Sequence, residues 1–411
     1  MALRSPFQLF SILPILCSTA LFGTRPSNGA SANSRLYSAR MADSVIMRGQ
    51  AIHDRNSDSS SLLQVGMFQN ALLDLVESPF GRFMEQDWEE YLGRSVDSVV
   101  GVVGDPSNDT QFPLDRLSVG RGLLCRYGQT GNKTYKDTLD ALRLSVDLQP
   151  RNQFGGFWYY VYPNWSYLDG MFSLLSFSPL YTSSFDIANS TTVIDDLFDQ
   201  LDLLWTHCHD TTTGLLFHGY DASRTAPWAN PVTGASPIVW IRALGWFLMG
   251  LVDFLELNPM DERASTWRAR FVDLSNALVG AVDPASGAWW QVMSAPGQWG
   301  NYIESSGSAM FVYALYKGVR GGFSPKSEGE ADYTSVAARA YEELVERFVV
   351  ENADGTLSYN GTVGVCSLNS TATYEYYIHQ RLVYDSVLGS AAFIRASIEH
   401  ELHHKALYYE S

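Results

Sequence analysis

Apolar residues recur with helical spacing through most of the chain, and short linkers rich in Gly, Pro, Asn and Asp separate the periodic stretches. The clearest stretch runs from Ser236 to Glu256. Ser236 suits the N-cap position and Pro237 the first helical position, and an apolar face follows them. The pattern predicts about eleven helices, over residues 61–77, 82–103, 116–129, 134–148, 168–180, 191–207, 237–256, 262–281, 302–319, 332–350 and 384–400.

Strand-like alternation is confined to three short segments, residues 156–162, 288–292 and 356–360. Helices of similar length joined by short linkers can close into an (α/α) barrel or extend as a helical solenoid. Aromatic residues cluster in the linkers, as expected if alternate linkers gather around one mouth. The pattern therefore favours an all-α barrel with a few short β-hairpins at the active-site end.

The first residues have the pattern of a secretory signal peptide. Arg4 precedes a short apolar run that Pro14 interrupts, and small polar residues follow it. We predict a signal peptide over residues 1–25, with cleavage between residues 20 and 32, and hence a secreted, extracellular protein. Residues 26–60 are polar and are predicted to be disordered, and residues 61–411 to form a single catalytic domain. The Asn-x-Ser/Thr sequons agree with export: Asn108, Asn132, Asn164, Asn189, Asn360 and Asn369.

The chain carries 28 basic and 44 acidic residues, a formal charge of −16. This excess of acid argues against nucleic acid, whose phosphates are bound through Lys and Arg, and no later apolar stretch reaches the length of a membrane span. An anionic substrate would need a local basic clamp that works against the overall field. Cys17 lies in the predicted signal peptide. The other cysteines, Cys125, Cys208 and Cys366, can form at most one bridge among themselves, and the sequence leaves its identity open.

Residues 155–170, GGFWYYVYPNWSYLDG, place a wall of aromatic rings ahead of one carboxylate, Asp169. Asp169 could simply cap the helix that starts there. Ring faces, however, stack on the C–H faces of pyranoses, while a few polar groups select the hydroxyls. Rings also flank isolated polar residues in segments 217–246, 298–311 and 373–378. A sugar site is therefore one interpretation of all four segments.

Each candidate residue also has a purely structural interpretation. Arg242 could pair with a buried acid, His218 could be a hydrogen-bonded core histidine, and Asp115 could cap a helix. Glu304 and Glu375 could bind backbone groups in the linkers. These alternatives stay open at the level of the residues alone.

Signals of other catalytic classes are weak. The cluster HCHD at residues 207–210 does not have the spacing of a zinc site, so no metal site is predicted. The chain also has no nucleophile elbow of a serine hydrolase and no Gly-rich phosphate loop after a strand.

Taken in order, the segments resemble glycoside hydrolase family 105, the unsaturated rhamnogalacturonyl hydrolases. The resemblance runs from about residue 80 to residue 400 and is most specific at 228–246 and 301–311. The matching segments are LD (114–115), PRN…GGFW (150–158), YPN…LDG (162–170), HGYD (218–221), WANPVTGASP (228–237), WIRALGW (240–246), NYIESSGSAMF (301–311) and YEYYI (374–378). The resemblance implies an (α/α)6 barrel and an oligosaccharide substrate that ends in a 4,5-unsaturated uronic acid, with no cofactor or metal.

The resemblance assigns the catalytic acid/base to Asp169, with Asp115 as a supporting carboxylate. It also implies substrate contacts from His218, Trp240, Arg242 and Trp246. The C4=C5 bond of such a sugar is an enol ether, so protonation of C4 and attack of water at C5 would release the rest of the molecule. One carboxyl group in a partly dry setting could donate the proton and then activate the water.

Two departures from the family pattern bear on the substrate. Tyr159 stands where the family usually has a histidine, and Tyr167 where it commonly has a tryptophan. We expect both residues, together with Trp165, to contact substrate. Tyrosine keeps a stacking face and a hydroxyl but carries no positive charge near neutral pH. Rhamnogalacturonan fragments are the expected substrate; a glucuronyl-specific relative and a non-catalytic sugar-binding protein are the alternatives, and the oligomeric state is open.

Overall fold

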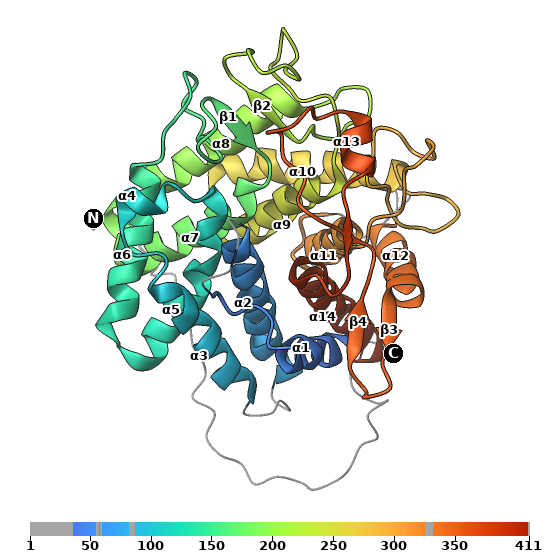
Figure 1. Ribbon diagram of the computed structural model, residues 1–411, viewed down its shortest axis with the longest axis horizontal. Coiled ribbons are helices and arrows are strands. Elements are labelled where there is room, and N and C mark those ends of the chain that lie inside the picture. The colour runs from blue at the N-terminus through green and yellow to red at the C-terminus, as the bar shows by residue number, and fades with distance from the viewer. Residues whose placement is uncertain (1–35, 55–56, 58–59, 82–86, 325–331, 410–411) are drawn as a thin grey trace, which may run out of the picture.

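The computed structural model describes residues 36–54, 57, 60–81, 87–324 and 332–409, and the predicted signal peptide lies outside them. The described chain is mainly helical (Figure 1). Its helices are α1 (Tyr37–Met47), α2 (Ser61–Glu77), α3 (Asp87–Val100), α4 (Pro106–Asp109), η3 (Leu114–Val119), α5 (Gly120–Thr130), α6 (Lys133–Asp147), α7 (Gly170–Phe185), η4 (Ile187–Asn189), α8 (Ser190–Cys208), α9 (Ile241–Leu257), α10 (Glu262–Gly280), α11 (Ser305–Arg320), α12 (Tyr333–Phe348), α13 (Tyr374–Ile378) and α14 (Val387–Tyr409).

The long helices form two concentric rings. In the inner ring α2, α5 with the preceding turn η3, α7, α9, α11 and α14 pack side by side, and α14 returns to α2. In the outer ring α3 packs on α2, α6 on α5, α8 on α7, α10 on α9, α12 on α11 and α1 on α14. Because consecutive helices alternate in direction, the inner helices run parallel to one another. The predicted (α/α)6 barrel is therefore confirmed.

Burial explains which helices lie inside. Nearly every residue of α9 is buried, as expected of a helix that is apolar around its whole circumference. The outer helix α12 buries only one stripe of side chains. The inner helices also approach closely: a Cβ on Gly250 of α9 would lie 2.7 Å from the carbonyl oxygen of Met171 on α7, so only glycine fits there.

Helix α1 corrects the prediction that residues 26–60 are disordered. Its buried face, which includes Met41, Ala42 and Val45, packs against α14. Ser38 Oγ donates a 2.5 Å hydrogen bond to Glu401 Oε2 on α14. The sequence of residues 26–60 is mostly polar because the short helix α1 has only one apolar stripe. The partner of that stripe lies at the other end of the chain, where sequence periodicity cannot find it.

The start of α9 is also different from the prediction. The helix begins at Ile241 with Trp240 as its N-cap, rather than at Pro237 after a Ser236 cap. Ser236 N donates to Gly219 O (2.9 Å) and His218 N donates to Ile238 O (3.1 Å), so this segment is extended. A Ser-Pro pair suits an extended segment as well as a helix start, and the pairing partner decides between them.

Three antiparallel ribbons complete the fold of the residues that the structure describes. They are β1 (Trp165–Tyr167) with β2 (Gly219–Asp221), β3 (Val349–Glu351) with β4 (Leu357–Tyr359), and β5 (Thr362–Val363) with β6 (Leu382–Val383). Strands β1 and β2 lie with α13 at the upper end of the molecule in Figure 1. The β3–β4 ribbon lies beside α1 instead, where Leu357 N donates a 2.7 Å hydrogen bond to Ser44 Oγ. The predicted strand at 356–360 therefore contains β4, whereas 156–162 and 288–292 contribute only isolated bridges.

A buried ion network ties the inner helices together. Arg395 on α14 contacts Asp74 on α2 (2.6 Å) and Asp253 on α9 (3.0 Å). Lys317 on α11 also contacts Asp253 (2.6 Å), and Arg121 on α5 contacts Asp74. Burial alone would raise the pKa of both carboxyls, but Arg395 and Arg121 hold the pKa of Asp74 below its usual value, and Lys317 and Arg395 do the same for Asp253.

None of the helices in the described ranges is both long enough and apolar enough to cross a membrane. Cys208 and Cys366 are buried free thiols.

Candidate active site

Four of the candidate polar residues lie just before or at the start of inner helices. Asp115 belongs to η3 ahead of α5, Asp169 directly precedes α7, Arg242 is in the first turn of α9, and Glu304 is the N-cap of α11. Because the inner helices are parallel, these positions gather at one end of the barrel. The positive ends of the helix dipoles point to the same place, which favours an anionic ligand there despite the acidic chain.

Asp169 faces a histidine rather than its own helix. Its side chain makes no capping hydrogen bond to α7, so the interpretation of Asp169 as a simple cap is wrong. Asp169 Oδ2 lies 3.1 Å from His218 Nε2, and His218 Nδ1 lies 2.7 Å from the hydroxyl of Tyr377. If Tyr377 donates to Nδ1, Nε2 carries the hydrogen and faces the carboxylate. His218 is fully buried, and Asp169 is 7% exposed.

Asp115 forms the second carboxyl group of the site. Tyr159 donates a 2.6 Å hydrogen bond to Asp115 Oδ2 and stacks on Tyr167 at 4.4 Å between ring centroids. Burial, reinforced by the charge of Asp169, raises the pKa of Asp115 to about 7, although the Tyr159 bond acts in the opposite direction. Burial therefore keeps Asp115 neutral below about pH 7. Pro113, not Asp115, occupies the N-cap of η3.

Unpaired buried atoms mark this part of the barrel. Asp115 Oδ1, Asp169 Oδ2 and His218 Nε2 are all buried and have no hydrogen-bond partner among the described residues. The 3.1 Å contact between Asp169 and His218 is close enough for a charge interaction but does not meet the angle of a hydrogen bond. Such atoms are costly to bury unless a ligand or water completes them, so they point to a binding site.

Arg242 is a buried cation anchored by neutral acceptors. Its guanidinium donates to the carbonyl oxygens of Val363 (2.5 Å) and Gly364, and its Nη1 lies 3.5 Å from Ser306 Oγ. Its Cζ lies 4.9 Å from the centroid of the Trp240 ring. No carboxylate forms an ion pair with Arg242 within the described ranges, which removes the interpretation of Arg242 as the partner of a buried acid. Its positive charge is therefore available to an anionic substrate.

Glu304 holds in place two residues that contact Arg242. The carboxylate accepts hydrogen bonds from Gly307 N (2.7 Å), Ser306 Oγ (2.7 Å) and Val363 N (3.0 Å). Ser306 and Val363 are two of the residues that contact Arg242. The interpretation that Glu304 binds backbone groups is thus confirmed, and those groups position the cation. Glu375, by contrast, lies exposed on α13.

The tryptophans predicted to contact substrate differ in how deeply they are buried. The Trp240 ring lies 4.8 Å from the ring of His218, and its Nε1 donates to Gln291 Oε1 (3.1 Å). Trp165 is half-buried in β1 and meets Trp228 edge to face at 5.1 Å. Trp246 is one turn further along α9 than Arg242 and packs on Phe172 (4.8 Å). The structure therefore places Trp246 in the core beneath the other candidates.

Sequence reasoning did not select Tyr377 and Gln291. Tyr377 is fully buried and contacts His218, and Gln291 Nε2 donates to the carbonyl oxygen of Tyr377 (3.2 Å). The available signals were a tyrosine in YEYYI and a polar residue inside the apolar run AWWQV. Neither pattern says which neighbour a side chain will meet, so only the fold could identify them.

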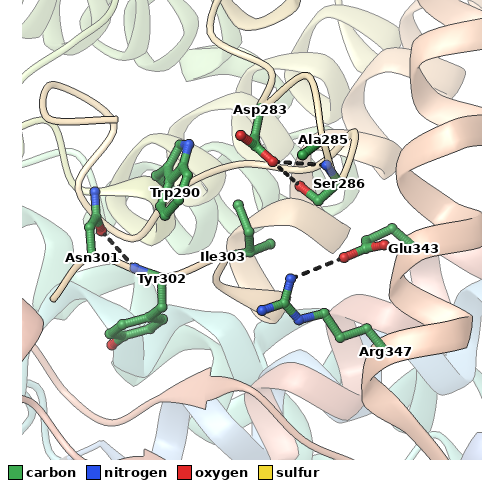
Figure 2. A pocket seen from close by; sticks show the side chains of 9 residues that line it. All are labelled: Asp283, Ala285, Ser286, Trp290, Asn301, Tyr302, Ile303, Glu343 and Arg347. Atoms are coloured by element: carbon green, nitrogen blue, oxygen red, sulfur yellow. Dashed lines mark hydrogen bonds and ion pairs between the residues drawn. The ribbon is translucent and has the colours of Figure 1, made fainter. Parts of the chain in front are cut away.

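A separate pocket of about 470 Å³ is lined in part by Trp290 and Ile303, which pair in an isolated antiparallel bridge (Figure 2). Gln291 faces Trp240 and Tyr377, whereas its neighbour Trp290 lines the pocket together with Ile303. Figure 2 shows the Glu343–Arg347 pair of α12 opposite Ile303. None of the predicted site residues lines this pocket. No cluster of three or more potential metal ligands occurs in the part of the chain that the structure describes.

An (α/α)6 barrel whose mouth combines two carboxyl groups, a buried arginine and several rings defines a carbohydrate-active enzyme of the helical-barrel class. The chain belongs to Glycosyl Hydrolase Family 88, whose sequence model matches residues 71–403, and it is a glycosidase.

The structure is similar to that of a family 105 glycoside hydrolase from C. acetobutylicum ATCC 824, at 28% identity and a TM-score of 0.78 over 90% of this chain and 100% of the other. This similarity, with the family match, confirms the resemblance to family 105. An unsaturated glucuronyl hydrolase from Bacillus sp. GL1 shares the fold, at 10% identity and a TM-score of 0.64 over 89% of this chain and 95% of the other. A protein of Agrobacterium fabrum is 36% identical over 192 residues, which are 45% of this chain and 82% of that protein.

Proposed function

We propose that this glycosidase removes a 4,5-unsaturated uronic acid from the non-reducing end of lyase-generated oligosaccharides, with rhamnogalacturonan fragments as its substrates. One observation carries the proposal. Asp169, whose buried Oδ2 lies 3.1 Å from His218 Nε2, is at the same end of the barrel as Arg242, a buried cation without a carboxylate partner among the described residues. An acid and an anion-binding group at one mouth match a substrate that has a reactive alkene and a carboxylate on the same ring.

In the proposed reaction Asp169 protonates C4 of the enol ether, and the positive charge that develops is shared between C5 and the ring oxygen. The Asp169 carboxylate then removes a proton from a water molecule, whose oxygen attacks C5. That proton restores the acid form of Asp169. The C5 hydroxyl of the resulting hemiketal then gives up its proton as C5=O forms and the bond from C5 to the ring oxygen breaks, which leaves a hemiacetal at C1. The hemiacetal hydroxyl loses its proton as C1=O forms, the bond from C1 to the glycosidic oxygen breaks, and the released oxygen takes up a proton. The anomeric carbon is not attacked, so the paired carboxylate geometry of ordinary glycosidases is not needed.

The surrounding groups serve this reaction in distinct ways. Arg242 binds the uronate carboxylate through N–H groups that its backbone contacts leave free. Asp115, with its pKa raised to about 7, stays neutral at lower pH and so does not repel that carboxylate. Tyr377 orients His218, which faces Asp169. The rings of Tyr159, Tyr167 and Trp240 exclude water from this part of the mouth.

A glucuronyl-specific hydrolase is the second candidate. Tyr159 favours it, because this residue departs from the usual family pattern and its hydroxyl is committed to Asp115. The two candidates share the acid, the arginine and the chemistry. They differ only in the sugar configuration and linkage that the mouth accepts.

Purified protein incubated with unsaturated disaccharides tests the proposal, because the enoate absorbs ultraviolet light and loses this absorbance when C4 is protonated. Decay with the rhamnogalacturonan disaccharide supports the leading candidate, and decay only with glucuronyl disaccharides supports the second. No decay with any of them contradicts both. Export is part of the proposal and rests on the leader-like first 25 residues. It predicts a mature N-terminus between residues 20 and 32 in protein recovered from the culture medium.

A further inference from the structure

Trp299 is the most exposed large hydrophobic side chain of the described chain, at 85% exposure. An isolated exposed leucine or valine needs no explanation, but an indole presents far more apolar area to water. Its neighbours along the chain, Gly297, Gln298 and Gly300, are small or polar. A protein partner would need a contact area of several hundred Å², which one ring cannot provide.

The loop that carries Trp299 is fixed by hydrogen bonds on both sides. Asn301 accepts from the backbone N–H groups of Val292 and Tyr302, and it donates to the carbonyl oxygens of Val292 (2.9 Å) and Ala295 (2.7 Å). The hydroxyl of Tyr374 lies 3.1 Å from the carbonyl oxygen of Trp299 itself. The ring is therefore presented from a constrained backbone, which lowers the entropy lost when a ligand binds to it.

This loop packs on the same short helix that reaches the catalytic pair. Gly300, with φ +87°, lies so close to α13 that a Cβ there would be 2.7 Å from Ile378 Cδ1. Tyr374 and Ile378 of α13 thus contact the loop, while Tyr377 of the same helix contacts His218. Trp299 consequently lies beside α13, at the same end of the barrel as Asp169 and His218.

We propose that Trp299 is a stacking platform for a sugar unit of the leaving oligosaccharide, beyond the unit that is joined to the unsaturated uronate. The proposal rests on the function proposed above and adds a preference for chain length. A ring face binds the C–H face of a pyranose without a charge or a directed hydrogen bond. Trp299 therefore strengthens the binding of longer fragments whatever their exact linkage, and it does not touch the reacting ring.

The test compares wild type with Trp299→Ala on an unsaturated disaccharide and on an unsaturated tetrasaccharide. We expect kcat/KM for the tetrasaccharide to fall about tenfold, mainly through KM, while the value for the disaccharide changes less than about twofold. Trp299→Phe keeps a ring face and should recover most of the loss. Met260→Ala is the matched control, because Met260 is 76% exposed in the turn after α9, at the opposite end of the inner helices.

The outcomes separate this inference from the function on which it rests. Equal effects of Trp299→Ala on both substrates, or no effect on either, overturn the platform while wild-type turnover leaves the proposed function intact. A tetrasaccharide defect that Trp299→Phe does not restore also overturns it, because the ring face would then not be the cause. If wild type turns over neither substrate, the proposed function fails and the platform fails with it.

Discussion

Asp169 Oδ2 lies 3.1 Å from His218 Nε2, and neither atom has a hydrogen-bond partner among the described residues. The pair is assembled by the β1–β2 ribbon, because Leu168 N donates to His218 O (3.0 Å) at the end of its ladder. Tyr377 fixes the far side of the imidazole ring. The fold therefore orients the Asp169 carboxyl group toward His218.

Replacement of Asp169 by asparagine tests the proposed acid. Asparagine keeps the shape and the acceptor but has no proton to donate to C4, so we expect kcat to fall by about 10³-fold or more, with KM or Kd for the disaccharide changed only a few-fold. The decay of enoate absorbance gives kcat and KM, and calorimetry gives Kd for the disaccharide. Asp186→Asn, at the other end of α7, is the matched control. Near-normal turnover by Asp169→Asn would assign the acid to another residue.

Arg242→Lys tests the anion-binding role. An ammonium group cannot reproduce two parallel hydrogen bonds to a carboxylate, and it cannot reach both carbonyl groups that Arg242 contacts. We expect KM to rise about tenfold or more with a smaller change in kcat. Steady-state kinetics on the disaccharide provides the measurement, and an unaltered KM would show that the uronate binds elsewhere.

Asp115 should set the alkaline limb of activity. Because its pKa is raised to about 7, it gains a negative charge above that pH, and we expect kcat/KM to decline there as the uronate is repelled. Asp115→Asn cannot ionise, so its profile should lack this limb. A raised carboxyl pKa also destabilises the folded protein as pH increases from the unfolded value toward 7. The thermal stability of Asp115→Asn relative to wild type should therefore increase over that range, and a constant difference would contradict the assignment.

Tyr159→Phe should shift the alkaline limb of the pH profile of kcat/KM, rather than only lower the activity. The Tyr159 hydroxyl donates to Asp115 and acts to lower its pKa, so removing it should shift the limb to higher pH. The stacked ring on Tyr167 remains, which keeps the packing comparable. A pH profile of kcat/KM is the measurement. A limb that stays in place would mean that Asp115 does not control it.

The buried ion network predicts a stability effect without a direct effect on the site. Arg395→Met leaves Asp74 and Asp253 without their shared partner, and we expect the free energy of unfolding to fall by about 3–5 kcal/mol. The lowered pKa values of both carboxyls mean that wild type should lose this stabilisation as pH falls below about 4. Arg347→Gln, which breaks an exposed pair with Glu343, should change stability by less than about 1 kcal/mol. Denaturant unfolding measures both free energies of unfolding. Equal losses in Arg395→Met and Arg347→Gln would show that the buried ion network does not stabilise the fold.

The architecture was largely predictable because it depends on local periodicity. The prediction of residues 61–77 coincides with α2, and most later long helices were found within about five residues of their observed ends. Helix α14, predicted over 384–400, runs to Tyr409, and the short helices α4 and α13 were not predicted. Helix α1 was missed because its apolar stripe is short and its partner, α14, lies at the opposite end of the chain. The start of α9 was misplaced because Ser236 pairs with Gly219, a contact that no local signal reveals.

By itself, the sequence determined the helical periodicity, the order of the segments that resemble family 105, and the candidate residues Asp169, Asp115, His218 and Arg242. Only the tertiary structure decided that Tyr377 and Gln291 join them, that Trp246 belongs to the core, and that burial raises the pKa of Asp115. The physical reason is that periodicity is a property of neighbouring residues along the chain. Desolvation and hydrogen bonding in the mouth depend instead on side chains that six parallel helices bring together from distant parts of it.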